Sequence, residues 1–153
     1  MQNRPRIMKL DDPDEGGVVY VDLVRFYETK LWEVKMTKVY IAGKISAYGS
    51  EMLNNMTAFY HMEDKLRRNG FAPFNPASDF LVGIMFGDYS YDMYFKPNLA
   101  WIEAADCIIM LDGWETSAGA LREHQIAKDL GKRIFLSYDK LVDWEKKLTG
   151  SGA

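Results

Sequence analysis

The run Cys107 to Leu111 and the segment behind it constrain the fold of this chain more than any other part of the sequence. The run is short, apolar and β-branched at its centre, which is typical of a parallel strand covered on both faces. Asp112 and Gly113 end it, and a turn of small residues leads to an expected helix from Ala120 to Leu130. Ligands of parallel sheets bind where strands end, so Glu123, early in this helix, is a candidate site carboxylate.

The rest of the chain repeats this alternation of strand and helix. Strands are expected at 38–42, 71–74 and 132–136, and helices at 51–69, 97–105 and 138–148, with Pro97 in the first turn of the second. The alternation predicts right-handed βαβ units. We therefore expect an α/β fold with a three-layer, doubly wound, mostly parallel sheet of the Rossmann-like or flavodoxin-like kind.

Two stretches fit this plan less well. Residues 77–95 mix glycines with several aromatics, and a lid or subunit contact is as good an interpretation as a hydrophobic cluster under a long loop. Residues 1–35 form an N-terminal extension, and the main domain is expected over 36–153. Val18 to Phe26 is rich in β-branched and aromatic residues, whereas Leu23, Phe26, Tyr27, Leu31 and Val34 also satisfy helical spacing. We favour a strand or hairpin there.

Composition excludes several classes of function. A chain of 153 residues with 48% hydrophobic content builds one core, and a net charge of -3 gives no reason to expect a nucleic-acid polymer or an anionic membrane as partner. No apolar stretch approaches the ~20 residues of a membrane span, and the polar start lacks a signal-peptide core, so we expect a cytoplasmic protein. Cys107 is expected to be inert core, and His61 and His124 lack partners at metal-ligand spacing, so no metal is expected.

Two loops are expected to converge at the carboxyl ends of neighbouring strands. One is Gly43 to Ser46, with Lys44 in it, and the other is the turn from Ser117 through Gly119 to Glu123. Free N–H groups and a helix dipole favour negative charge, so the pair would cradle a phosphate or a sugar. Small residues also precede helices without any function, and that interpretation has equal weight.

At this point the chain resembles a known family. The matching residues are Tyr40 to Gly43, Asn55, Phe59, Asn75, Pro76, Asp106, Leu111 to Glu115, Ser117 to Ala120, Glu123, Ala127 and Gly131. Together they resemble the nucleoside 2-deoxyribosyltransferase superfamily, most closely its small branch common in phages and bacteria. The resemblance covers about Lys38 to Leu136.

The resemblance implies an enzyme that needs no cofactor. In that superfamily the glutamate matching Glu123 attacks the anomeric carbon of a ribose or 2-deoxyribose through an oxocarbenium-like transition state. The tyrosine matching Tyr40 would orient the carboxylate, although a buried strand tyrosine is an equally fair interpretation. Transfer of the sugar to a second base gives a transferase, and transfer to water gives an N-glycosidase.

Ser117 favours one of these outcomes. Superfamily transferases of free nucleosides usually have an acidic residue there, whereas the monophosphate hydrolases have serine, which can donate to a phosphate that a carboxylate would repel. With Gly119 and with Lys44 or Ser46 opposite, we favour a nucleoside 5′-monophosphate as the ligand.

Two residues depart from the superfamily pattern. Asn98 replaces a usual aspartate, and an amide cannot act as a general acid, so the leaving base would take its proton from another group, such as Asp92, or from water. Asn98 could instead hydrogen-bond an edge of the base. Lys44 replaces the usual proline after Gly43.

Trp114 has three interpretations: stacking on the base, packing at a dimer interface, and simple anchoring of its loop. Superfamily members are typically homo-oligomers, so a homodimer or higher homo-oligomer is expected, with 77–95 as a possible contact surface. The leading hypothesis is a nucleotide N-glycosidase. The alternatives are a deoxyribosyltransferase on free nucleosides and, because of Asn98, a catalytically inactive nucleotide-binding module.

Overall fold

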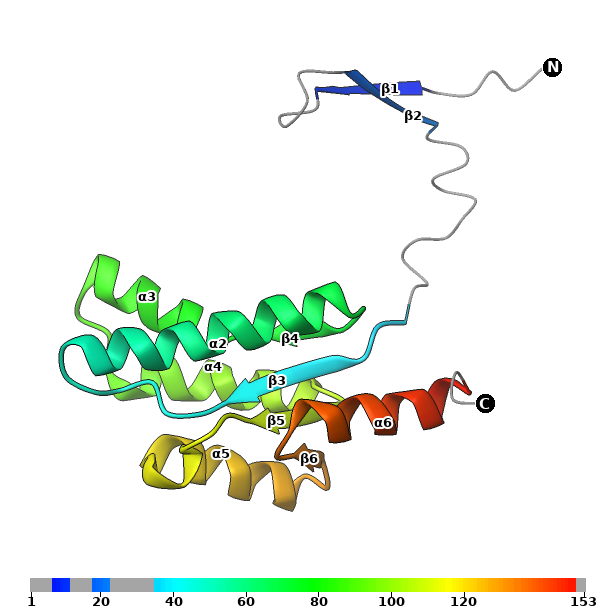
Figure 1. Cartoon of the computed structure of the whole chain (residues 1–153). Coiled ribbons are helices and arrows are strands. Elements are labelled where there is room, and N and C mark those ends of the chain that lie inside the picture. The colour runs from blue at the N-terminus through cyan, green and yellow to red at the C-terminus, as the bar shows by residue number, and fades with distance from the viewer. Residues whose placement is uncertain (1–6, 12–17, 23–34, 151–153) are drawn as a thin grey trace. The chain divides into compact units, whose positions relative to one another are not determined.

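The computed structural model describes residues 7–11, 18–22 and 35–150, and the chain divides into two compact units, Met1–Lys35 and Met36–Ala153. In the first unit, β1 (Ile7–Asp11) and β2 (Val18–Asp22) pair as antiparallel strands (Figure 1). A strand in the stretch that begins at Val18 is thus present as far as Asp22. The remainder of that stretch, to Phe26, lies outside the described residues.

The second unit is built on a four-stranded parallel sheet. Its strands are β3 (Lys38–Ala42), β4 (Ala72–Phe74), β5 (Cys107–Met110) and β6 (Arg133–Phe135), in the order β4-β3-β5-β6. The predicted doubly wound α/β fold is confirmed. The winding direction reverses between β3 and β5, and the crevice at the carboxyl ends of such a strand pair is where open α/β sheets bind ligands.

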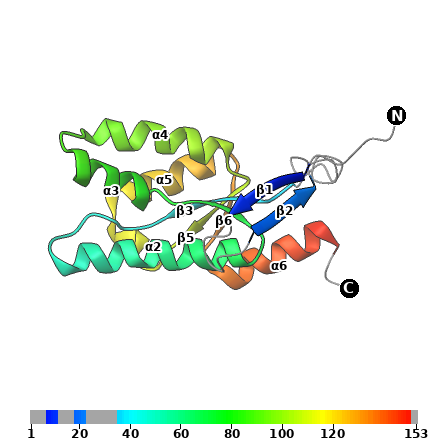
Figure 2. The same ribbon diagram turned by 90° about the horizontal axis from the view of Figure 1, so that it is seen from above.

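Helices cover both faces of the sheet. The helices α2 (Ser50–Arg68) and α6 (Tyr138–Thr149) lie on one side, and α4 (Tyr91–Ala104) and α5 (Ala118–Asp129) lie on the other (Figure 2). The helix α3 (Ala77–Phe86) lies at the end of the sheet towards which the strands point (Figures 1 and 2). No helix in the described part of the chain has the length and apolar character needed to cross a membrane.

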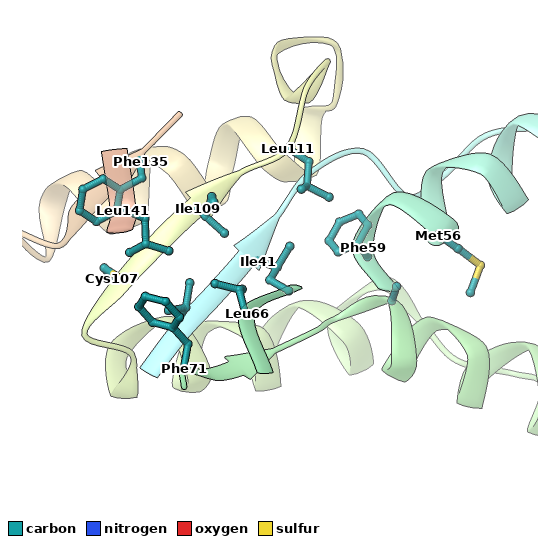
Figure 3. Close-up of a cluster of buried hydrophobic side chains, with 12 residues drawn as sticks. Ile41, Met56, Phe59, Leu66, Phe71, Cys107, Ile109, Leu111, Phe135 and Leu141 are labelled. Carbon is teal, nitrogen blue, oxygen red and sulfur yellow. The ribbon is translucent and has the colours of Figure 1, made fainter. Parts of the chain in front are cut away.

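Successive strand residues alternate between two cores. Ile41 and Ile109 enter the core beneath α2 and α6, where they meet Phe59, Leu66 and Leu141 (Figure 3). The intervening strand residues enter the opposite core, and they are Tyr40, Ala42, Ile108 and Met110. This period of two directs the Tyr40 side chain towards the face that α4 and α5 cover.

The structure corrects the expectations for residues 77–105. We predicted an irregular stretch followed by a helix that starts at Pro97, but α3 occupies the first part and α4 begins at Tyr91, with Pro97 inside it. The apolar residues of α3 occur all around the helix, so they show no helical period. A proline removes one backbone N–H, and α4 retains its helical path with Ile102 buried against the sheet.

Candidate functional site

A cavity of about 470 Å³ opens where β3 and β5 end. The loop after β3, the start of α3, the first half of α4 and the start of α5 form its walls. Its lining residues are Gly43, Lys44, Ile45, Ser46, Pro76, Phe80, Tyr91, Tyr94, Phe95, Asn98, Thr116, Ser117, Ala118, Gly119, Ala120 and Glu123. The two loops that the sequence predicts to converge therefore do face one cavity.

Gly43 lets the first loop pass close over the core. The Leu111 N–H donates to the Ala42 carbonyl at 2.8 Å, which extends the ladder between β3 and β5 by one step. A Cβ at position 43 would lie 3.0 Å from Leu111 Cβ and 3.2 Å from Phe59 Cζ. A larger residue would therefore push the loop outwards, away from the cavity floor.

Ser117 starts the helix that forms the opposite wall. Its Oγ accepts a hydrogen bond from the Ala120 N–H at 3.3 Å and so caps α5. The first N–H groups of an α-helix have no partner within the helix, and the first two residues of α5, Ala118 and Gly119, line the cavity. Together with the helix dipole they make this edge favourable for an anion.

Glu123 lies buried at the cavity, with only 7% of its surface exposed. The Tyr40 hydroxyl donates to Glu123 Oε1 at 2.7 Å, and the Tyr40 side chain is fully buried. The strand β3 thus supplies the donor and the helix α5 supplies the carboxylate. The contact between Tyr40 and Glu123 that the family resemblance implies is present.

Burial changes the acidity of both partners. It raises the pKa of Glu123 to about 7, against the lowering effect of the hydrogen bonds from Tyr40 and Asn98. Burial, followed by the charge of Glu123 and its hydrogen bond, raises the pKa of Tyr40 well above the ordinary tyrosine value. Tyr40 therefore remains a neutral donor, while Glu123 populates both its charged and neutral forms near neutral pH.

Asn98 completes the polar group around Glu123. It lies in α4 with 9% of its surface exposed, lines the cavity and hydrogen-bonds Glu123 through its side chain. Its Oδ1 has no hydrogen-bond partner within the described part of the chain.

The other predicted polar residues of the first loop also line the cavity. Lys44 and Ser46 both contribute to it, but Lys44 Nζ lies 2.8 Å from Glu51 Oε1 at the start of α2. Glu51 therefore partly neutralises the positive charge that the sequence places opposite Ser117.

Two predicted residues, Asp92 and Trp114, do not line the cavity. Asp92 is exposed and forms an ion pair with Lys96 at 2.9 Å, one turn further along α4. Trp114 stacks on His124, with ring centroids 4.5 Å apart. This contact anchors the loop after β5 to α5.

An aromatic wall is the part of the site that the sequence interpretation did not assign. We use this name for Phe80 of α3 together with Tyr91, Tyr94 and Phe95 of α4. Tyr91, Phe95 and Asn98 recur at the spacing of one helix face, and this signal was available in the sequence.

Contacts between neighbouring elements hold the aromatic wall in place. The Tyr94 ring lies 5.6 Å from that of Phe80 and crosses α3 at Gly83, where a Cβ would come within 2.6 Å of Tyr94 Cζ. The Arg122 guanidinium lies 4.5 Å from the Phe95 ring centroid, and this contact connects α5 to α4.

Metal-ligating and nucleophilic groups are sparse in the described part of the chain. No three His, Cys, Asp or Glu side chains there are arranged to hold a metal ion. Burial raises the pKa of Cys107 to about 12, so this side chain is a thiol inside β5. Glu123 is the one buried carboxylate of the cavity in the described residues.

A family comparison covers this whole site. The sequence model of a domain of unknown function, DUF4406, matches residues 37–136. The chain belongs to the DUF4406 family. Every cavity-lining residue, and Tyr40 beneath them, falls within the DUF4406 match, whereas the unit Met1–Lys35 lies outside it. No curated protein matches the chain significantly.

Proposed function

We propose that this protein cleaves the N-glycosidic bond of a nucleoside 5′-monophosphate, as a member of the nucleoside 2-deoxyribosyltransferase superfamily. One observation carries the proposal: the buried Glu123 carboxylate, held by the Tyr40 hydroxyl at 2.7 Å, lies in a cavity whose edge is the N-terminus of α5. This arrangement combines a nucleophile with an anion-binding edge.

The chemistry requires a carboxylate. A Glu123 oxygen attacks the anomeric carbon while the bond from that carbon to the base nitrogen breaks and its electron pair leaves with the base. The negative charge stabilises the oxocarbenium-like transition state, and a glycosyl ester of Glu123 forms. Water then attacks the same carbon, which releases the sugar phosphate and restores the carboxylate.

The walls of the cavity fit the two ends of a nucleotide. The 5′-phosphate would lie at the start of α5, against the Ser117 hydroxyl and the Ala118 and Gly119 N–H groups. The base would lie against the aromatic wall, because flat rings stack favourably on aromatic side chains. A volume of about 470 Å³ is in the range of small-molecule sites.

The leaving base would take its proton from water. Asn98 carries no acidic proton, and Asp92, exposed and paired with Lys96, does not line the cavity. Cleavage without a protein acid depends on how well the base carries negative charge. We therefore expect the rate to rise with the acidity of the leaving base across a series of substituted nucleotides.

Transfer of the sugar to a second base is the alternative outcome. It uses the same ester of Glu123, and the aromatic wall that holds the leaving base would equally hold an acceptor base in its place. Ser117 favours monophosphates over free nucleosides in either case, because its hydroxyl donates to a phosphate without repelling it.

The deciding experiment is release of free base, followed by chromatography, from a panel of nucleosides and 5′-monophosphates with and without an added acceptor base. We expect release from monophosphates without acceptor, loss of release in Glu123→Ala, and unchanged release in Glu103→Gln, an exposed carboxylate of α4. Release of free base that occurs only when an acceptor base is present would establish the transferase alternative. Tight nucleotide binding without turnover, unchanged in Glu123→Gln, would overturn both in favour of a binding module.

A further inference from the structure

The side-chain amide of Asn98 hydrogen-bonds within the protein through only one of its two polar groups. Its side chain is buried at the cavity wall, and Oδ1 has no partner among the described residues. A buried acceptor without a donor is costly, and native structures keep few of them. Because Asn98 lines the cavity, a ligand that brings a hydrogen-bond donor to this oxygen would satisfy it.

The orientation of the amide follows from its neighbour. Asn98 hydrogen-bonds the Glu123 carboxylate, which only accepts when ionised, so the donor is the Asn98 Nδ2 group. Rotation of the amide by half a turn would place Oδ1 against the carboxylate oxygens, and two acceptors would then face each other. Glu123 thus fixes Oδ1 as an acceptor for the ligand.

The position of Oδ1 limits which ligand group can reach it. Nδ2 and Oδ1 belong to the same planar amide, so Oδ1 lies beside the carboxylate that would attack the anomeric carbon. A phosphate dianion has no hydrogen to donate, and it would lie at the start of α5. The N–H groups of a base would lie towards the aromatic wall, further from the reacting carbon than the sugar hydroxyls.

Among the sugar hydroxyls, the 2′-hydroxyl is on the carbon bonded directly to the reacting carbon. As positive charge develops on the anomeric carbon, the 2′-hydroxyl becomes a stronger donor, so a hydrogen bond to it stabilises the transition state more than the ground state. We propose that Asn98 Oδ1 accepts this hydrogen bond and makes the site selective for ribonucleotides over 2′-deoxyribonucleotides. This inference rests on the proposed function and deepens it.

The kinetic test compares matched substrates. Base release is measured for each ribonucleoside 5′-monophosphate and its 2′-deoxy and 3′-deoxy counterparts. For wild type we expect kcat/KM to fall on the order of 10- to 100-fold without the 2′-hydroxyl, because the buried acceptor is then unpaired, and to fall less without the 3′-hydroxyl. Equal or faster cleavage of the 2′-deoxy substrates, or a larger loss with the 3′-deoxy series, overturns the proposal.

Variants of Asn98 separate selectivity from folding. Asn98→Leu removes both polar ends at similar volume, so the ribo-to-deoxy ratio should fall towards one. Asn98→Asp keeps an acceptor oxygen, so the preference should persist. Asn69→Ala, at the exposed end of α2, is the matched control and should keep the wild-type ratio. A preference for ribonucleotides that survives in Asn98→Leu contradicts the role of this amide.

A binding experiment tests Asn98 independently of turnover. Calorimetry compares ribose 5-phosphate with 2-deoxyribose 5-phosphate on wild type and Asn98→Leu. We expect wild type to bind the ribose compound at least about tenfold more tightly and Asn98→Leu to bind the two equally. If no base is released from any nucleotide but this difference is found, the hydrolase proposal falls and the Asn98 inference stands. No binding, or equal binding to wild type, overturns the inference.

Discussion

The Tyr40 hydroxyl lies 2.7 Å from Glu123 Oε1, and each group changes the acidity of the other. The hydrogen bond lowers the pKa of Glu123, although burial holds it at about 7. Burial first, and then the nearby carboxylate, raise the pKa of Tyr40, so the phenol stays protonated. Tyr40 therefore makes the ionised form of Glu123 more accessible without becoming an acid itself at neutral pH.

The pH dependence of kcat/KM should reveal the pKa of Glu123 and the effect of Tyr40 on it. In the proposed mechanism the nucleophile is the ionised Glu123, so kcat/KM should rise as pH increases through about 7 and then become constant. Tyr40→Phe removes a hydrogen bond that favours the ionised form, and the rise should move to higher pH. Tyr48→Phe, at a side chain with 97% of its surface exposed, is the control and should keep the wild-type profile. An unchanged profile in Tyr40→Phe would contradict this coupling.

The same carboxylate should cost stability as the pH rises from acidic to neutral. Its pKa is raised from 4.5 in the unfolded chain to about 7 in the fold, so the folded state binds the proton more tightly and stability falls as pH rises between these values. Glu123→Gln should therefore gain about 3 kcal/mol relative to wild type between pH 4 and pH 8, since each pKa unit corresponds to about 1.4 kcal/mol. Denaturant unfolding at several pH values measures this difference, and a gain that does not depend on pH would contradict it.

Ser117 should decide whether a phosphate is accepted. Aspartate also caps helices well, so Ser117→Asp should keep α5 intact and place a negative charge at the anion-binding edge. We expect kcat/KM for the monophosphate to fall roughly 10- to 100-fold through repulsion, with a smaller change for the free nucleoside. Steady-state kinetics on both substrates measure the two effects, and an equal loss on both would show that the phosphate does not lie at Ser117.

Gly83 should be required for the aromatic wall. Alanine normally stabilises a helix relative to glycine, but a Cβ at position 83 would overlap the Tyr94 ring. Gly83→Ala should lower the free energy of unfolding by about 1–3 kcal/mol and raise KM, because Tyr94 must move. In the Tyr94→Ala background the same change should be neutral or stabilising, and an identical loss in both backgrounds would rule out this contact as the cause.

The sheet was predictable because each strand carries its own local signal. The runs around Ile41 and Ile109 are short, apolar and followed by turn residues, so their positions agree with the structure to within one or two residues. The helices α3 and α4 were harder to predict. The apolar residues of α3 have no helical period, and Pro97 resembles a first-turn proline although it lies inside α4.

The site was predictable where it depends on strand ends. Gly43, Ser117 and Glu123 follow or face the ends of β3 and β5, so the topology alone brings them to one cavity. Asp92 follows Tyr91 on α4, but its side chain points about 100° away from that of Tyr91 and pairs with the exposed Lys96 instead of lining the cavity. The direction of a helix face depends on packing, and the sequence does not give it.

The floor and the aromatic wall of the cavity belong to different parts of the fold. Tyr40 and Glu123 come from β3 and from the helix after β5, whereas Phe80, Tyr91, Tyr94 and Phe95 come from α3 and α4 at the rim. A descendant of this protein can therefore exchange its rim residues for others while its sheet and its carboxylate stay as they are. In the proposed enzyme, the choice of base and the reactivity of Glu123 would therefore depend on different parts of the fold, and natural selection could change one of them at a time.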